Sequence, residues 1–315
     1  MLCKKGFIMK FIIELIKGMF VGIANIIPGV SGGTMAITFG VYDKIISSIT
    51  GLFKNFKKSV KTLLPIAIGM VVGIAAFAYL LPYLLKTQPF CTSAAFTGLI
   101  VGGIPMIIKS LKEGWNNGTK KSLPVNVIIF IILFAVSLIM PFLSGESESG
   151  ILLTANAPTM IKVFFLGIIA AATMVIPGVS GSLVLMILGY YFGIITAVKD
   201  FLEGLKGLDF GIMLDNGLVL APFAIGCLVG IFFVSKLIEW LFNNYSSATF
   251  SGILGLIVTS PVSIFYKVHQ EYSLANTSIL QVIIGVIILV ACIWVTLYMG
   301  KLEEKLDKDK STSEA

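Results

Sequence analysis

Several long stretches of this 315-residue chain contain no charged residue and no His, and six of them are candidate membrane spans. They cover 63–85, 90–108, 123–144, 218–235, 240–266 and 272–300. Each reaches the roughly 18 apolar residues that a membrane-spanning helix needs. Because a bilayer offers the backbone no hydrogen-bond partners, such stretches must form helices. Hydrophobic residues make up 57% of the chain and charged residues 12%, against about half and a quarter in soluble domains. The sequence therefore predicts an all-α integral membrane protein.

A helix-breaking motif occurs twice in these apolar surroundings. The first copy, "NIIPGVSGGTMAITFG", covers 25–40, and the second, "MVIPGVSGSLVLMILG", covers 174–189. Aligning Pro28 with Pro177 gives an offset of 149 (177 − 28). Later segments also pair: "LLPIAIGMVVGI" (63–74) with "LAPFAIGCLVGI" (220–231), and "AAFTGLI" (94–100) with "ATFSGIL" (248–254). The chain therefore contains one ancestral unit in two copies.

Each unit is predicted to be a broken segment followed by three spans. The first repeat, 1–150, has a hairpin at 11–50 and spans at about 63–85, 91–108 and 124–143. The second repeat, 151–300, has a hairpin at 160–198 and spans at about 218–240, 248–266 and 278–299, and 301–315 form a cytoplasmic tail. Between Lys162 and Lys199 lie 36 uncharged residues (199 − 162 − 1). Two full spans need about 40, so the length favours a re-entrant helical hairpin, with two full spans as the alternative.

Lysine alternates between the loops. The segments around 4–10, 54–61, 109–121 and 301–310 are rich in Lys, and the loops between them hold few. Lys-rich loops face the cytoplasm, which places both termini there and explains the net charge of +7 without a nucleic-acid partner. The first broken segment then has cytoplasmic flanks and the second has external flanks, so the two repeats are inverted. Inverted repeats are typical of secondary transporters, whose substrate site lies at the repeat interface near the midplane.

The repeated motif has the chemistry of an anion site. Pro ends the incoming helix, Gly permits unusual backbone angles, and Ser is a good N-cap for the outgoing helix. Free N–H groups and the positive end of a helix dipole then converge on one point. The candidate substrate-binding residues are Asn25, Pro28, Gly29, Val30, Ser31, Gly32, Gly33 and Thr34 in the first copy, and Pro177, Gly178, Val179, Ser180, Gly181 and Ser182 in the second. The alternative is that the motif is only a tight turn at which helices pack.

Few other residues suggest chemistry. Glu14 and Lys17 lie three apart on one predicted helix face and can pair there. Charges inside a membrane indicate function by default, so we consider both as candidates for coupling or headgroup binding. The four Cys are scattered and the chain has one His, so we expect no disulfide framework, metal site or cofactor. No nucleotide-binding loop is present in the sequence.

The doubled motif, "IIPGVSGGT" and "VIPGVSGS", resembles that of the bacterial polyprenyl-phosphate transporter family, the undecaprenyl phosphate translocases. The resemblance covers roughly 11–300. It implies a multi-pass plasma-membrane protein that is not an enzyme. Such a protein returns the lipid carrier undecaprenyl phosphate from the outer to the inner leaflet, for reuse in cell-envelope polymer synthesis. Its partners are then the polyprenyl phosphate and the surrounding bilayer.

Two other functions use the same residues. A transporter or channel for a small soluble anion can use the same helix-end site. An intramembrane serine hydrolase is suggested by "GVSG", but a nucleophilic Ser needs a general base within hydrogen-bond reach. Here Ser31 and Ser180 would have to share the single histidine, His269, which lies in "KVHQEY" at a loop edge. We therefore regard the hydrolase as the weaker alternative.

Overall fold

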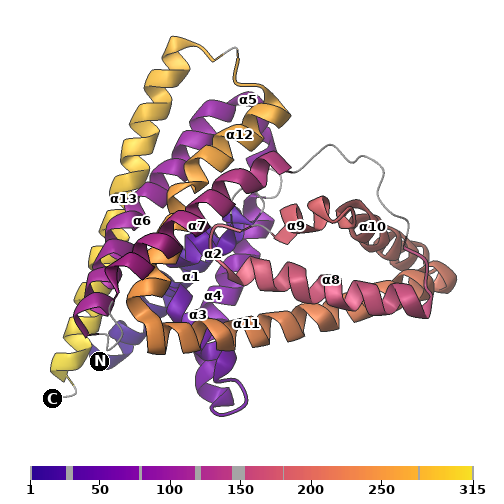
Figure 1. The fold of residues 1–315 in the computed structure, drawn as a ribbon, viewed down its shortest axis with the longest axis horizontal. Helices are drawn as coiled ribbons and strands as arrows, with labels where there is room; N and C mark the ends of the chain where they lie inside the picture. Colours follow the sequence, from indigo (N-terminus) through magenta and orange to yellow (C-terminus); the bar gives the residue numbers. More distant parts are fainter. Residues whose placement is uncertain are drawn as a thin grey trace.

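The computed structural model describes residues 2–25, 31–77, 80–117, 122–143, 153–179, 181–275 and 277–313. Throughout these ranges the regular secondary structure is α-helical and no β-strand occurs. The helices are α1 (Leu2–Ala24), α2 (Gly32–Thr38), α3 (Tyr42–Thr50), α4 (Phe56–Phe77), α5 (Leu80–Thr87), α6 (Pro89–Asn117), α7 (Leu123–Leu143), α8 (Ala157–Val175), α9 (Gly181–Ile187), α10 (Tyr191–Gly207), α11 (Phe210–Val258), α12 (Ser260–Tyr272) and α13 (Ile279–Ser313). The start of α1 and the end of α13 lie at the same end of the molecule (Figure 1).

The predicted membrane class is confirmed by helix length and composition. Six helical segments of the described chain are long and apolar enough to cross a membrane. They are Phe56–Phe77, Pro89–Asn116, Leu123–Leu143, Ala157–Val175, Phe210–Tyr272 and Ile279–Lys301. The longest of them bends at Tyr245, whose backbone angles (φ −138°, ψ 44°) are not helical. This bend divides α11 between the predicted spans 218–240 and 248–266, and the second part continues into α12.

The incoming arm of each hairpin is a long helix and the returning arm is broken. α1 has 23 residues and α8 has 19, which at 1.5 Å per residue gives about 35 and 28 Å. These arms are longer than the short helices expected of a re-entrant hairpin. The returning arms are α2 with α3, and α9 with α10, each interrupted by a turn at a glycine. The helices that follow the two copies of the motif begin at Gly32 and Gly181, which are 149 residues apart.

The two interrupting turns have the same geometry. Gly40 and Gly189 both have positive φ, 68° and 79°. The Gly40 N–H donates to the Ile37 carbonyl at 2.9 Å, and the Gly189 N–H donates to the Met186 carbonyl at the same distance. Glycine adopts this left-handed conformation without the Cβ clash that other residues suffer. The sequence repeat is therefore also a repeat of local structure.

Glycines set the close approach of helices within each half. Gly18 of α1 faces the backbone of Ile66 in α4, and Gly167 of α8 faces the backbone of Phe223 in α11. A Cβ at either position would overlap the facing carbonyl oxygen. Small residues of this kind let membrane helices pack backbone to backbone. The pairs α1–α4 and α8–α11 occupy corresponding positions in the two sequence repeats.

Other helix pairs join the two halves. α6 of the first half packs along α13 of the second, where Gly98 faces the backbone of Leu289. α7 of the first half packs along the second part of α11, where a Cβ on Gly255 would lie 2.6 Å from the Phe130 carbonyl oxygen. By the sequence pairing, α6 corresponds to this second part of α11. Each half therefore contributes one helix to each of two reciprocal pairs.

Candidate functional site

The two motifs form the breaks between a long helix and a short one. The first break runs from the end of α1 to Gly32, and the second from the end of α8 to Gly181. Four predicted site residues, Pro28, Gly29, Val30 and Ser180, lie outside the described residues. The other ten are described.

The structure brings the two breaks into contact. The Gly178 N–H donates to the Thr34 hydroxyl oxygen at 2.8 Å, although these residues are 144 positions apart. A Cβ on Gly33 would lie 3.3 Å from the Met174 carbonyl oxygen and 3.4 Å from the Pro177 Cα. The two copies of the motif, which are far apart in the sequence, therefore meet in the fold. The Gly178 N–H, which we expected to be available to an anion, is bound to Thr34.

A network of hydroxyl groups from α7 and the end of α11 contacts the second break. The Thr259 hydroxyl donates to the Ser137 hydroxyl oxygen at 2.6 Å, and the Ser137 hydroxyl lies 3.2 Å from the Leu256 carbonyl oxygen. Ser137 also lies 3.5 Å from the carbonyl oxygen of Gly178. Both hydroxyl-bearing residues are buried. Because buried polar groups in a membrane need partners, this network fixes α7 and the end of α11 against the second break.

Ser31 occupies the N-cap position of α2, as predicted, but its side chain does not cap. Its backbone is extended (φ −98°, ψ 129°), and the hydroxyl makes no capping hydrogen bond. The first helical bond runs from the Met35 N–H to the Ser31 carbonyl at 3.2 Å. The N–H groups of Gly32, Gly33 and Thr34 precede that bond, where a helix provides no acceptor. These three N–H groups are main-chain donors in the described part of the first break.

Asn25 lies beside the start of α2. Its amide nitrogen donates to the Val21 carbonyl at 2.9 Å, one turn back along α1. A Cβ on Gly32 would lie 2.5 Å from this nitrogen and 2.6 Å from the amide oxygen. Glycine at position 32 therefore makes room for the Asn25 side chain, which lines the cavity described next.

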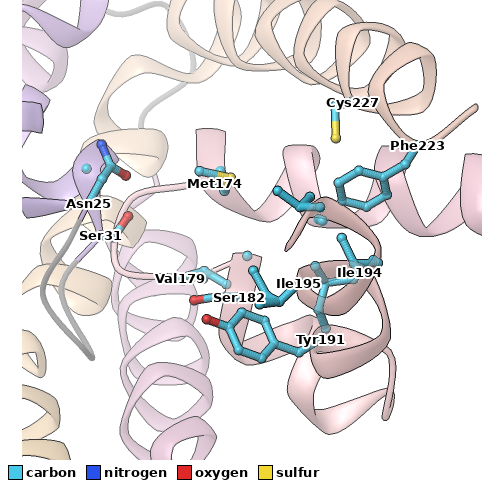
Figure 2. Close-up of a pocket in the computed structure, with 15 residues that line it drawn as sticks. Asn25, Ser31, Met174, Val179, Ser182, Tyr191, Ile194, Ile195, Phe223 and Cys227 are labelled. Carbon is cyan, nitrogen blue, oxygen red and sulfur yellow. The ribbon is translucent and has the colours of Figure 1, made fainter. Parts of the chain in front are cut away.

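A cavity of about 340 Å³ is lined by both breaks. The first break contributes Asn25, Ser31 and Gly32, and the second contributes Val179, Gly181 and Ser182. The rest of the wall comes from α8, α9, α10 and α11: Ala170, Met174, Leu185, Tyr191, Ile194, Ile195, Val198, Phe223 and Cys227. In Figure 2 the hydroxyls of Ser182 and Tyr191 point toward the side of Asn25 and Ser31, and Phe223 and Cys227 lie on the far side.

The cavity is neutral and mostly apolar. None of its lining residues carries a charge, and the polar groups gather where the breaks meet. The volume lies within the range of small-molecule sites, about 300–1,000 Å³. An amphiphile fits this division, with a polar end at the breaks and an apolar chain along α8 and α10.

The intramembrane charges lie elsewhere. Glu14 and Lys17 of α1 are buried, with exposed fractions of 6% and 0%, and neither lines the cavity. The Glu14 Oε1 accepts a hydrogen bond from the Lys44 Nζ of α3 at 2.8 Å. The sequence spacing had suggested Lys17, three residues away, as the partner of Glu14. The Glu14 Oε2 is buried without a hydrogen bond to the described residues. The ion pair joins the two arms of the first hairpin.

The single histidine has a structural role. The His269 Nδ1 accepts from the Leu274 N–H at 3.0 Å, at the end of α12. The side chain of His269 is exposed, whereas Ser31 is 7% exposed. A ring nitrogen that accepts a backbone N–H is not available as the general base that a serine nucleophile requires.

The cavity wall was not predicted from the sequence. Tyr191, Ile195 and Phe223 face the cavity, but their apolar spacing is that of any packed helix. Lys44 was likewise not predicted as the partner of Glu14, because the two are joined only by the fold.

Comparison with known proteins gives a consistent family. The sequence profile described as undecaprenyl phosphate translocase-like matches residues 21–282. The chain is similar to a polyprenyl-phosphate transporter of Staphylococcus aureus, with 31% identity over 278 residues, covering 88% of this chain and 94% of the relative. It is also similar to a polyprenyl-phosphate transporter of Vibrio cholerae, with 28% identity over 268 residues, covering 80% of this chain and 77% of the relative. No solved structure matches the chain significantly.

Proposed function

This chain belongs to the undecaprenyl phosphate translocase-like family, and we propose that it carries undecaprenyl phosphate across the bacterial plasma membrane. The relatives in Staphylococcus aureus and Vibrio cholerae are both named polyprenyl-phosphate transporters, which supports lipid-carrier transport. The proposed direction is from the outer to the inner leaflet, where the carrier is reused for envelope polymers. Both termini are proposed to lie in the cytoplasm, because the Lys-rich loops alternate in that sense.

The observation that carries the proposal is the cavity lined by both breaks. The phosphate binds where the breaks meet, near the N–H groups of Gly32 and Gly33 and the side chains of Asn25, Ser31 and Ser182. The isoprenoid units next to the phosphate lie along the apolar wall, and the rest of the tail stays in lipid. α2 and α9 have only seven residues each, so their individual N–H groups matter more than a long helix dipole.

A neutral site suits transport of a charged headgroup. Taking an ion out of water costs several kcal/mol even after the surroundings relax. Backbone N–H groups and hydroxyls offset part of that cost. A lysine in the cavity would offset more of it and would also hold the phosphate strongly, which would slow release. The cavity lining contains no such charge.

The arrangement of helices supports an inverted-repeat transporter. The reciprocal pairs, α6 with α13 and α7 with the second part of α11, are those expected if a pseudo-two-fold axis relates the halves. The breaks meet at the interface between the halves, where transporters of this kind hold their substrates. The motif residues outside the described ranges, including Pro28 and Ser180, are proposed to belong to the same site.

A small-anion transporter is the second candidate, because the same N–H groups can bind inorganic phosphate. The apolar wall favours the lipid, since a hydrated anion gains nothing from residues such as Ile195 and Phe223. Competition separates the two candidates. If the isoprenoid chain of the lipid contributes to binding, excess inorganic phosphate should leave transfer of the lipid unchanged. If the protein recognises the phosphate headgroup alone, excess inorganic phosphate should block transfer.

The test is leaflet transfer of a labelled polyprenyl phosphate in proteoliposomes. Ile195→Trp fills the cavity from α10 and should abolish transfer. Ile283→Trp places the same residue on α13, outside the cavity lining, at a similar exposed fraction, 53% against 48%, and should leave transfer unchanged. Equal rates for the two variants in folded protein would contradict the site.

A further inference from the structure

The two hairpins share one sequence pattern and one local geometry but differ in their surroundings. The second hairpin encloses the cavity between α8 and α10. In Figure 1, α2 and α3 lie near the centre of the molecule, whereas α10 extends to its right-hand edge. Several residues of the first hairpin that correspond to the cavity wall, including Val21, Ala36, Tyr42 and Ile46, belong to the main hydrophobic core.

Matched residues quantify this difference. Ile195 lines the cavity and is 48% exposed, whereas its counterpart Ile46 is 2% exposed. Tyr191 lines the cavity, whereas its counterpart Tyr42 is 4% exposed. The counterpart positions are mostly small or medium-sized apolar residues, as in the second hairpin. The sequence therefore permits a similar cavity in the first hairpin, and packing closes it.

Contacts with the second half close the first hairpin. The Tyr42 hydroxyl donates to the Val175 carbonyl, at the end of α8, at 2.8 Å. The Tyr42 ring also meets Phe242 of α11 edge-on, with centroids 6.2 Å apart. The hydroxyl of Tyr191 makes no hydrogen bond with the part of the chain that the structure describes, and its ring packs on its own neighbour, Phe192. One tyrosine of the pair is thus docked across the halves and the other is not.

The ion pair adds a second closing contact. Glu14 and Lys44 join α1 to α3, and their counterparts in the second repeat are Val163 and Gly193, which cannot form a salt bridge. The Glu14 carboxylate is only half satisfied, because its Oε2 has no hydrogen-bond partner among the described residues. An ion pair in which a buried oxygen lacks a hydrogen bond stabilises the fold less than a pair whose hydrogen bonds are all made. It can therefore hold the hairpin closed without making the closure permanent.

We infer that the first hairpin contains a second binding cavity for the same amphiphilic phosphate, closed in this structure, and that the two cavities open in turn. In an inverted repeat, exchanging the conformations of the two halves gives a second state that faces the other side of the membrane. Both states are populated if their free energies differ by no more than a few kcal/mol. This inference rests on the proposed function for the identity of the ligand, but its geometry does not depend on that ligand.

The experiment uses one cysteine reporter in each hairpin. Cys3, Cys91, Cys227 and Cys292 are replaced by Ala, and Ile46→Cys or Ile195→Cys is added in separate proteins. The rate of alkylation by N-ethylmaleimide is measured in proteoliposomes without any lipid substrate. We expect the thiol at position 195 to react faster than the thiol at position 46, because it lines the open cavity.

Tyr42→Phe then tests the exchange. Removal of one hydrogen bond of ordinary strength, about 1 kcal/mol, should raise the alkylation rate at position 46 about fivefold without raising the rate at position 195. Tyr191→Phe is the matched control, because it removes the same hydroxyl from a side chain that is not docked, and it should not raise the rate at position 46.

Two results would overturn the inference. One is an unchanged rate at position 46 in Tyr42→Phe. The other is a parallel rise at positions 46 and 195, which would indicate general loosening. Failure of the proposed function is a different pattern, with the alkylation rates changing as expected while the protein transfers no polyprenyl phosphate.

Discussion

Ser182→Asp tests the headgroup position most directly. Ser182 is the second residue of α9, lines the cavity and is exposed, so a slightly larger side chain fits there. A carboxylate in the first turn of a helix stabilises that helix by about 0.3–1 kcal/mol. The substitution should therefore preserve the fold while placing a negative charge beside the proposed phosphate.

The expected effect follows from Coulomb's law. Two unit charges about 6 Å apart, at an effective dielectric constant of about 20, repel by about 3 kcal/mol. That energy corresponds to a roughly 100-fold loss of headgroup affinity. Transfer of labelled polyprenyl phosphate at a subsaturating concentration should fall by a similar factor. Thermal unfolding in detergent should show no loss of stability.

Ser182→Asn is the control for this prediction. It has the shape of Asp without the charge, and it should retain most of the transfer activity. Two outcomes would refute the assignment of the headgroup to this end of the cavity: normal transfer by Ser182→Asp, or an equal loss in Ser182→Asn.

Three further predictions concern stability, measured by thermal unfolding in detergent. Lys44→Met removes the partner of the buried Glu14 carboxylate. Removing one partner of a fully buried ion pair costs about 3–5 kcal/mol, and the loss here should be smaller because the Lys44 side chain is 27% exposed. Adding Glu14→Val should recover most of the lost stability, and a purely additive double variant would contradict the pairing. Gly226→Leu forces a side chain into the backbone of α8 and should destabilise strongly, whereas Gly207→Leu, with nothing within 4 Å of its Cβ position, should not. Gly189→Ala should cost about 1–2 kcal/mol because φ is 79° there, and stability equal to that of Gly207→Ala would refute the argument.

Local chemistry made the helix boundaries at the motif predictable. Pro, Gly and Ser act on their own neighbours, so the sequence placed Ser31 correctly at the N-cap of α2. The apolar spans were predictable because the bilayer constrains each helix separately. The bend at Tyr245 lies between the predicted spans 218–240 and 248–266, although the helix continues through it.

The tertiary contacts of the site could not be predicted. Thr34 bonds to Gly178 across 144 positions, and nothing in either copy alone specifies that contact. Glu14 has Lys17 three positions away, yet the turn at Gly40 brings Lys44 within 2.8 Å. The sequence repeat covers both halves, whereas the cavity that both breaks line extends between α8 and α10 of the second hairpin.

The charge of the proposed substrate has a consequence for the inward transport that we propose. Any fixed charge of the protein returns with the empty carrier, so a full transport cycle moves only the charge of the phosphate and of any ion bound with it. Moving one negative charge into a cell whose interior is negative costs about 2.3 kcal/mol per 100 mV. Transport of the lipid anion alone therefore cannot concentrate it in the inner leaflet. Inward transport then requires either continuous consumption of the carrier on the cytoplasmic side or neutralisation of the headgroup by a proton or cation that travels with it.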